Sequence, residues 1–166
     1  MMARIPVSRP LVVSHLPLAL LVTHGLLACN GGDDGEQPVF PADYAATYQE
    51  VRGCRLSLEH DLVRMRVLAA PDALTPYNGR TAPFPTGAVV LKEQFDSGDT
   101  SCAGPLVSIT VMQKLDVGSS PETIDWQWQT ADPDHRTVPS DINRCTQCHL
   151  DCGKPPDGYD GTCTVP

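Results

Sequence analysis

The stretch Ile124-Asp125-Trp126-Gln127-Trp128-Gln129 alternates apolar and polar side chains without a break. Successive side chains of a β-strand point to opposite faces of a sheet, so this period of two predicts a strand with one buried face. Three further stretches, at residues 63–67, 87–95 and 107–111, are also rich in β-branched or alternating apolar residues. Short connections with glycine and proline separate them, which favours an antiparallel sheet as the main element of the fold.

Short helices are expected beside this sheet. Residues 42–52 have a helical pattern that ends at Gly53. Ser140 can cap the N-terminus of a second helix, while residues 71–85 are rich in turn formers and are expected to be irregular. The predicted fold class is therefore α+β, a mainly antiparallel β-sheet with a few short helices, one of them near the C-terminus.

This last helix carries the pentad Cys145-Thr146-Gln147-Cys148-His149. A Cys-x-x-Cys-His pattern is the attachment motif of c-type haem, in which both thiols form thioethers with the porphyrin. The adjacent histidine then becomes a ligand of the iron. The pentad predicts haem c as the cofactor, bound through Cys145 and Cys148, with His149 as the metal ligand.

The N-terminus predicts an export signal over residues 1–28. Two arginines precede an apolar run at residues 16–27, and the segment has no acidic side chain. The run is too short for a transmembrane helix. It ends in Leu26-Leu27-Ala28-Cys29, which resembles the processing box of bacterial lipoproteins. An ordinary secretory signal followed by a coincidental cysteine is the alternative.

In the lipoprotein interpretation Cys29 is the lipidation site, and several acyl chains together anchor a protein almost permanently. Asn30 follows it, which by the enterobacterial sorting pattern favours the outer membrane. The expected location is the bacterial outer membrane or the periplasmic face of a membrane. Residues 29–39 are rich in glycine and acidic side chains and are expected to form a flexible linker. The haem domain then occupies residues 40–166.

The charge of the chain limits its partners. The formal net charge is −8, and because residues 1–28 contain two arginines and no acid, the remainder is near −10. Such a body repels nucleic acid and anionic membrane surfaces, so membrane contact is expected only through the lipid anchor. A basic redox partner protein is the macromolecule that this charge favours.

Seven cysteines divide among lipid, haem and disulfides. Beyond those assigned to lipid and haem, Cys54, Cys102, Cys152 and Cys163 remain, and an oxidising compartment favours their pairing. Cys54–Cys102 and Cys152–Cys163 are the natural pairs, since the second closes a loop rich in glycine, proline and aspartate. The other two connectivities stay open.

A zinc site is the competing interpretation of the C-terminal residues. Its ligands would come from Cys145, Cys148, His149, Cys152 and Cys163. This interpretation leaves the exported setting and the immediate Cys-His adjacency unexplained. The protein would then be a non-haem lipoprotein with a zinc or disulfide site.

In this sequence the strands come first and the pentad comes last. Small c-type cytochromes are all-helical with the pentad near the start, and four-helix-bundle cytochromes have no such strands, so this chain differs from both. The order resembles the cytochrome P-460 family and its relative cytochrome c′-beta, with the closest likeness to lipoprotein members. The resemblance covers most of residues 44–150. It rests on RGCRLSLEH at 52–60, FPTGAVVLKE at 84–93, ITVMQK at 109–114, DWQW at 125–128 and the pentad.

The resemblance implies a role for Lys92, which occupies the position of a strand lysine that is bonded to the porphyrin in P-460 proteins. Lysine is uncommon inside an apolar strand, so Lys92 requires an edge position or a partner. The alternative is a surface lysine that pairs with Glu93 or another neighbouring acid.

The resemblance also implies a distal haem pocket that carries bulky apolar groups in gas-binding members and a carboxylate in catalytic members. Phe84, Phe95 and Met112 are the candidates for an apolar wall. Glu59 and Glu93 are the candidates for the carboxylate, and with Lys92 they form the predicted catalytic set.

Other residues with ligand chemistry are expected elsewhere. His60 is expected in a solvated turn or a structural hydrogen bond, and His135 in a loop. Trp126 and Trp128 are expected in the core. Met112 is expected to pack there as well.

Three functions are compatible with these residues. The first is the binding or oxidation of small nitrogen species, hydroxylamine or nitric oxide, which would make the protein a haem oxidoreductase with an open iron site. The second is a six-coordinate electron-transfer cytochrome with Met65 or Met112 as sixth ligand. The third is the non-haem lipoprotein. The resemblance further implies a homodimer.

Overall fold

A computed structural model describes residues 36–163 of the chain. The predicted signal at residues 1–28, the predicted lipid attachment site Cys29 and most of the predicted linker lie outside the described residues. No helix within residues 36–163 has the length and apolar character needed to cross a membrane.

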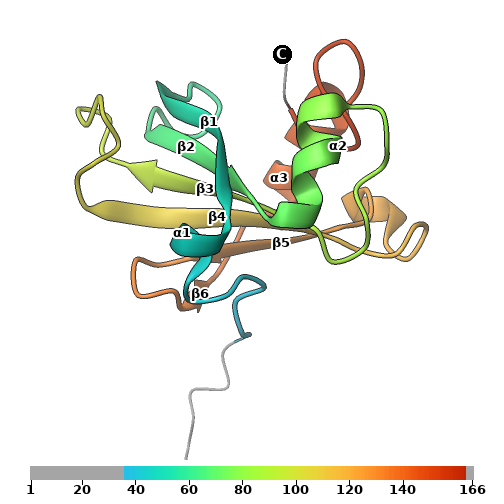
Figure 1. Ribbon diagram of the computed structural model, residues 1–166, viewed down its shortest axis with the longest axis horizontal. Helices are drawn as coiled ribbons and strands as arrows, with labels where there is room; N and C mark the ends of the chain where they lie inside the picture. Colours follow the sequence, from blue (N-terminus) through green and yellow to red (C-terminus); the bar gives the residue numbers. More distant parts are fainter. Residues whose placement is uncertain (1–35, 164–166) are drawn as a thin grey trace, which may run out of the picture. The chain divides into compact units, whose positions relative to one another are not determined.

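The described residues form a six-stranded antiparallel sheet in which every strand pairs with the strand that precedes it in the chain (Figure 1). The strands are β1 Gln49–Leu56, β2 Arg64–Ala69, β3 Val89–Phe95, β4 Leu106–Lys114, β5 Trp126–Ala131 and β6 Thr137–Val138. The α-helices are α1 Tyr44–Thr47, α2 Leu74–Gly79 and α3 Ile142–Cys152, and single 3-10 turns lie at η1 Pro71–Ala73 and η2 Pro121–Thr123. The predicted α+β class is confirmed.

The helix expected at residues 42–52 is much shorter than predicted. It ends at Thr47, because Tyr48 adopts an extended conformation and the chain enters β1. Tertiary pairing with β2 overrides the local helical pattern from Gln49 onward. Gly53 therefore lies inside a strand, between the register shifts that separate Glu50 from Arg55, and does not end a helix.

Two other local predictions need correction. Residues 71–85 contain the short helix α2, which follows the 3-10 turn at Pro71. The N-cap of α3 is Asp141, whose carboxylate accepts a hydrogen bond from the backbone N–H of Arg144 at 3.1 Å. Ser140 donates its hydroxyl to Thr130 Oγ1 instead, at 2.8 Å, so its side chain is occupied by the sheet.

The sheet has two covered faces. The α3 face includes Val90, Lys92, Met112 and Trp128. Val90, Met112 and Trp128 are direct cross-strand neighbours, and Lys92 is two positions after Val90 in β3, so all four side chains lie on one face. Helix α3 lies on this face, where His149 contacts Trp128.

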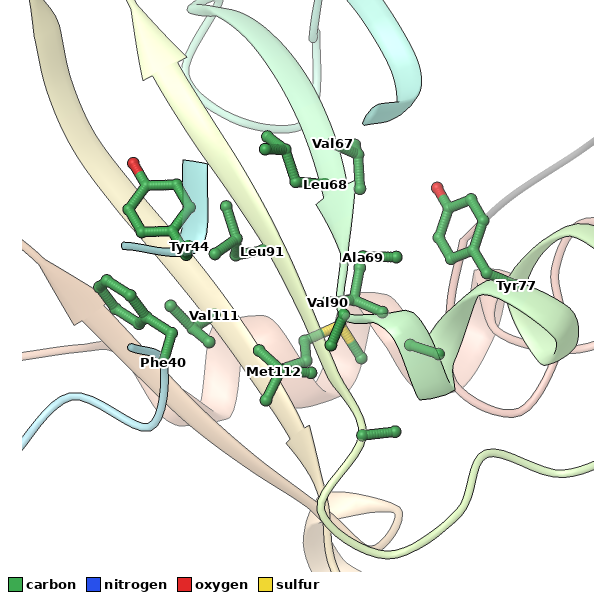
Figure 2. Packing of buried hydrophobic residues seen from close by; sticks show 14 of the residues in the cluster. Phe40, Tyr44, Val67, Leu68, Ala69, Tyr77, Val90, Leu91, Val111 and Met112 are labelled. Carbon is green, nitrogen blue, oxygen red and sulfur yellow. The ribbon is translucent and has the colours of Figure 1, made fainter. Parts of the chain in front are cut away.

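The α1 face includes Leu91, Glu93 and Val111, and the segment that contains Phe40 and Tyr44 covers it. Figure 2 shows Phe40 and Tyr44 with Leu91 and Val111 in the buried cluster. Leu91, Ile109, Val111 and Trp126 are among the most completely buried side chains. This continuous core, which draws on both faces, fixes β3 in the middle of the sheet and so fixes the direction of the Lys92 side chain.

Two disulfides connect the periphery of the described unit. Cys54 of β1 is bonded to Cys102 in the β3–β4 connection, and Cys152 at the end of α3 is bonded to Cys163. These are the pairs that the sequence favours. The second disulfide closes a loop directly against the helix that carries the pentad.

Candidate haem site

Helix α3 presents the pentad in two environments. Cys145 and His149 are one helical turn apart and point to the sheet side, where Cys145 is half-buried and His149 is buried. Cys148 is exposed, and neither Cys145 nor Cys148 takes part in a disulfide. Burial raises the pKa of the Cys145 thiol. The pair is therefore free for covalent attachment of a group at the edge between helix and sheet.

His149 has a fixed orientation. Its Nδ1 lies 2.6 Å from the carbonyl oxygen of Gly161, and its ring packs edge-on to Trp128 with centroids 4.7 Å apart. Because a carbonyl can only accept, Nδ1 carries the proton and the lone pair is on Nε2. Burial, followed by the charge of Lys92, lowers the pKa of His149 to about 3. The ring is neutral at physiological pH, which is the form that binds metals.

Lys92 of β3 lies on the same face as α3. Its Nζ is 2.8 Å from Nε2 of His60. Burial lowers the pKa of Lys92 to about 8, and the charge of a Cys145 thiolate acts on the amine in the opposite sense. Burial and the charge of Lys92 lower the pKa of His60 to about 4. At neutral pH the ammonium of Lys92 therefore donates to a neutral His60.

The turn between β1 and β2 brings His60 to this position. Val63 closes the turn by accepting from the N–H of Ser57 at 2.9 Å and donating its own N–H to the carbonyl of His60 at 3.2 Å. Asp61 forms an ion pair with Arg144 of α3 at 2.7 Å, and Arg144 immediately precedes Cys145. The turn thus connects Lys92 of the sheet with the helix that carries the pentad.

This arrangement can be compared with known proteins. Residues 45–155 match the family described as Cytochrome P460. The chain belongs to the cytochrome P460 family. No curated protein matches the chain. Membership implies a haem cofactor, and the pentad at the end of the matched region indicates c-type attachment.

The residues on the α3 face fit a haem. Two free thiols and a neutral histidine with an available Nε2 form the donor set. Thr110, the direct cross-strand partner of Lys92, has a buried hydroxyl without a hydrogen-bond partner among the described residues. Leu58, two residues before His60 in the β1–β2 turn, is 68% exposed. A buried hydroxyl with capacity for a partner and an exposed leucine close to His60 in sequence are compatible with a bound, largely apolar group.

The structure separates the two acidic candidates. Glu59 lies exposed on the β1–β2 turn, where its charge acts on Lys92. Glu93 follows Lys92 in β3 and therefore points to the α1 face, where it pairs with Arg66 and accepts from the Tyr44 hydroxyl at 2.8 Å. Glu93 and Lys92 therefore point to opposite faces and do not pair with each other. The predicted role of Glu93 as a carboxylate at the haem is not supported by this geometry.

The apolar candidates are also divided. Met112 lies on the α3 face, paired with Val90 and Trp128. Phe84 packs edge-on to Trp126 with ring centroids 5.1 Å apart. Phe95 lies on the α1 face, where the guanidinium of Arg66 is 5.6 Å from its ring centroid. Of the three predicted wall residues, Met112 is the one that the sheet register places on the face of Lys92.

The disulfide at the end of α3 changes the set of thiols available for zinc. Cys152 and Cys163 are bonded to each other, which leaves Cys145, Cys148 and His149 of the ligands named for the zinc interpretation. Within residues 36–163 no group of three or more histidine, cysteine or acidic side chains has the geometry to hold a metal ion.

Sequence reasoning did not identify His60 and Gly161 as parts of the site. His60 belongs to one of the stretches that resemble the family, and its neighbours Glu59 and Asp61 predict a solvated turn or a structural hydrogen bond. The structure shows a hydrogen bond, and its partner is Lys92, which the sequence did not indicate. Gly161 acts through its backbone carbonyl, and no side-chain pattern could indicate that role.

Proposed function

We propose that this cytochrome P460 family member is an exported, lipid-anchored mono-haem c-type cytochrome that binds or oxidises small nitrogen species such as hydroxylamine and nitric oxide. The observation that carries the proposal is the Lys92–His60 pair on the face of the pentad. Burial lowers the pKa of both groups, and neighbouring groups with lowered pKa values are typical of reactive sites.

Cys145, Cys148 and His149 are the residues that would hold the haem. Haem, when bound, supplies an iron centre that accepts a small ligand and exchanges one electron at a time. The hydrogen bond from Nδ1 of His149 to Gly161 keeps the imidazole in the tautomer that offers Nε2. The chain itself therefore orients the metal ligand before the cofactor arrives.

Lys92, held by His60, can handle protons of a bound substrate. With a pKa of about 8, Lys92 has both protonation forms populated near neutral pH, which is the condition for efficient proton transfer in both directions. The neutral imidazole of His60 accepts from the ammonium of Lys92 at 2.8 Å and so holds the amine in place. Oxidation of hydroxylamine releases protons, and the neutral amine form of Lys92 is the form that can accept one, which favours an oxidative role over simple electron transfer.

The proposed setting follows from the sequence. Cys29 would carry the lipid, and a charge near −10 for the remaining chain favours a basic redox partner that accepts the electrons. The location proposed is the outer membrane or the periplasmic face of a membrane.

The decisive experiment is the absorption spectrum of protein produced in a strain with intact cytochrome c maturation. We expect covalent haem by mass spectrometry and a spectrum that changes when nitric oxide is added. A ferrous Soret band shifted far to the red would further support a bond between Lys92 and the porphyrin. Lys92→Met should alter the spectrum, whereas Lys154→Met, at an exposed lysine of the C-terminal loop, should not.

Two outcomes contradict the proposal. Absence of covalent haem in the parent protein would exclude a cytochrome function. A six-coordinate ferrous spectrum that nitric oxide does not change would favour an electron-transfer protein. In that case Met65 and Met112 are the residues to substitute, because both are buried on the α3 face.

A further inference from the structure

An ion pair lies at the end of β4, and its acidic member is next in sequence to the residue that contacts His149. Lys114, the last residue of β4, is 5% exposed, and its Nζ is 2.9 Å from Oδ1 of Asp160. The same ammonium is 5.0 Å from the centroid of the Trp126 ring. Lysine is rarely buried, and removing two ions from water costs several kcal/mol that their attraction only partly offsets. Lys114 is buried and the Asp160 side chain is 25% exposed. An ion pair in such a setting is weak evidence for stability, and its effect on the position of neighbouring groups is the relevant property.

Asp160 is held from three directions. Lys114 binds Oδ1, and Oδ2 accepts the backbone N–H of Phe84 at 3.0 Å. The backbone carbonyl of Asp160 accepts from Nε1 of Trp126 at 2.9 Å. The next residue, Gly161, supplies the carbonyl that accepts from His149. A continuous set of contacts therefore connects Lys114 with the imidazole of His149.

The backbone of the loop that contains Asp160 packs closely against its neighbours at two glycines. Gly161 has a φ of +81°, and a Cβ on it would lie 2.7 Å from Nε1 of Trp126. A Cβ on Gly153 would lie 2.3 Å from the carbonyl oxygen of His149. The Cys152–Cys163 disulfide closes the loop at its ends. Close packing and a covalent closure restrict the loop, and the Lys114–Asp160 pair selects the position of the Gly161 carbonyl within it.

We infer that Lys114 and Asp160 are positioning residues for His149: they hold the Gly161 carbonyl against Nδ1 and so set how strongly the imidazole donates to haem iron. This inference rests on the proposed haem function. A firmly held acceptor makes an imidazole a stronger donor, which stabilises ferric over ferrous iron. A mobile carbonyl weakens the donor and raises the reduction potential.

The test uses haem-loaded protein with the double substitution Lys114→Met/Asp160→Asn. The substitution keeps the net charge, so a change in potential does not arise from an altered total charge. Lys154→Met/Asp157→Asn is the matched control, since it makes the same chemical changes at two exposed residues of the same loop. Mass spectrometry checks haem attachment, and circular dichroism checks the fold.

In the test variant the iron–histidine stretching frequency of the ferrous protein, measured by resonance Raman spectroscopy, should fall. The midpoint potential should rise by about 59 mV, which corresponds to a tenfold change in the ferric–ferrous equilibrium for one electron. The control should match the parent in both measurements. If the test variant folds, carries haem and also matches the parent, the inference is wrong.

Failure of the haem function would be distinguishable from failure of the inference. If the parent protein carries no covalent haem, the proposed function is wrong, and so is the proposed effect of Lys114 and Asp160 on haem iron. Ring nitrogen NMR of that protein then reports the remaining claim: Nδ1 of His149 should be the protonated nitrogen in the parent, and a tautomer mixture should appear in the double variant. Should the double variant not fold, Asp160→Asn alone keeps an oxygen for Phe84, and its Raman shift should be smaller and of the same sign.

Discussion

Lys92 and Glu93 are neighbours in β3, yet they point to opposite faces of the sheet and meet opposite surroundings. Glu93 is 5% exposed on the α1 face, where an arginine and a tyrosine hydroxyl satisfy its carboxylate. Lys92 contacts a neutral histidine on the α3 face, and its cross-strand partner Thr110 has a hydroxyl without a hydrogen-bond partner within residues 36–163. One strand therefore carries a complete polar cluster on one side and an incomplete one on the other.

The different surroundings of Glu93 and Lys92 suit them to different roles, stability for Glu93 and chemistry for Lys92. A satisfied buried carboxylate contributes to the folded state only as long as its partners remain. An amine with a lowered pKa and a weak partner contributes little to stability, and it is the kind of group that a site retains for chemistry. The difference in completeness is one reason to propose the α3 face as the ligand-binding face.

The largest expected effect concerns the thiols of the α3 face. Cys145→Ser/Cys148→Ser should abolish covalent haem attachment, because no thiolate remains to form a thioether. Intact-mass spectrometry measures this directly. As a control, Cys152→Ser/Cys163→Ser should retain haem and lose about 3 kcal/mol of unfolding free energy, the value expected for closing a short loop. Attachment that survives in the first variant would contradict the assignment of the pentad.

The next effect compares the two faces by the same kind of substitution. Arg66→Met should lower the unfolding free energy by about 3 kcal/mol, because it leaves the Glu93 carboxylate buried without its cation. Lys92→Met should change the unfolding free energy by less than about 1.5 kcal/mol, since methionine has a similar volume and the hydrogen-bond partner of the amine is a neutral imidazole. Urea titrations of the holoproteins provide both values. Equal losses would remove the distinction between the faces.

A smaller effect is expected in the pH dependence of stability. The pKa of Lys92 is about 8 in the folded protein and about 10.4 in an unfolded chain. Between these values the unfolded state binds more protons, so the contribution of Lys92 to stability increases as the pH rises from 8 to 10 and is unfavourable below 8. The other titratable or charged groups that act on this amine include His60, Arg55, Glu59, Cys145 and Cys148.

The measurement is the difference in unfolding free energy between the parent and Lys92→Met at pH 7.5 and pH 9.5. The difference should shift in favour of the parent at the higher pH. Groups common to both proteins cancel in this comparison, including Tyr44, whose pKa is raised by burial and by its bond to Glu93. A difference that does not change with pH would show that Lys92 titrates normally.

The smallest effect is expected at the ion pair between the β1–β2 turn and α3. Both Asp61 and Arg144 are exposed, and exposed ion pairs contribute little to stability. Asp61→Asn should leave the thermal midpoint unchanged, while a slight change in the haem spectrum would report a looser turn around His60. A large loss of stability would mean that this turn is part of the core structure.

The sequence predicted the features that depend on local periodicity. Alternation in residues 124–129 places a strand where β5 is found, and the pentad lies on the helix that follows. The same alternation already separates Lys92 from Glu93, so it could have excluded Glu93 as a haem-side carboxylate. The helix predicted at residues 42–52 was wrong because pairing with β2 outweighs a local helical preference.

The remaining parts of the site are non-local. His60 reaches Lys92 across 32 positions of sequence, and Lys114 reaches Asp160 across 46. Neither contact has a periodic or compositional signature, because each depends on where a turn or loop folds back on the sheet. Family resemblance could identify Lys92 as a candidate site residue. Its partner His60 could be identified only from the three-dimensional structure.

The strand order has a consequence for the assembly of the protein. Each strand pairs with the one synthesised just before it, so the sheet can form hairpin by hairpin while the C-terminal residues are still being made. Cys54 and Cys102 both precede β4 and can meet first, and the bridge between Cys152 and Cys163 spans 11 positions. The bridge between Cys54 and Cys102 can therefore form before the other four cysteines of the domain have been made, which reduces the number of wrong pairings open to the thiols of the pentad.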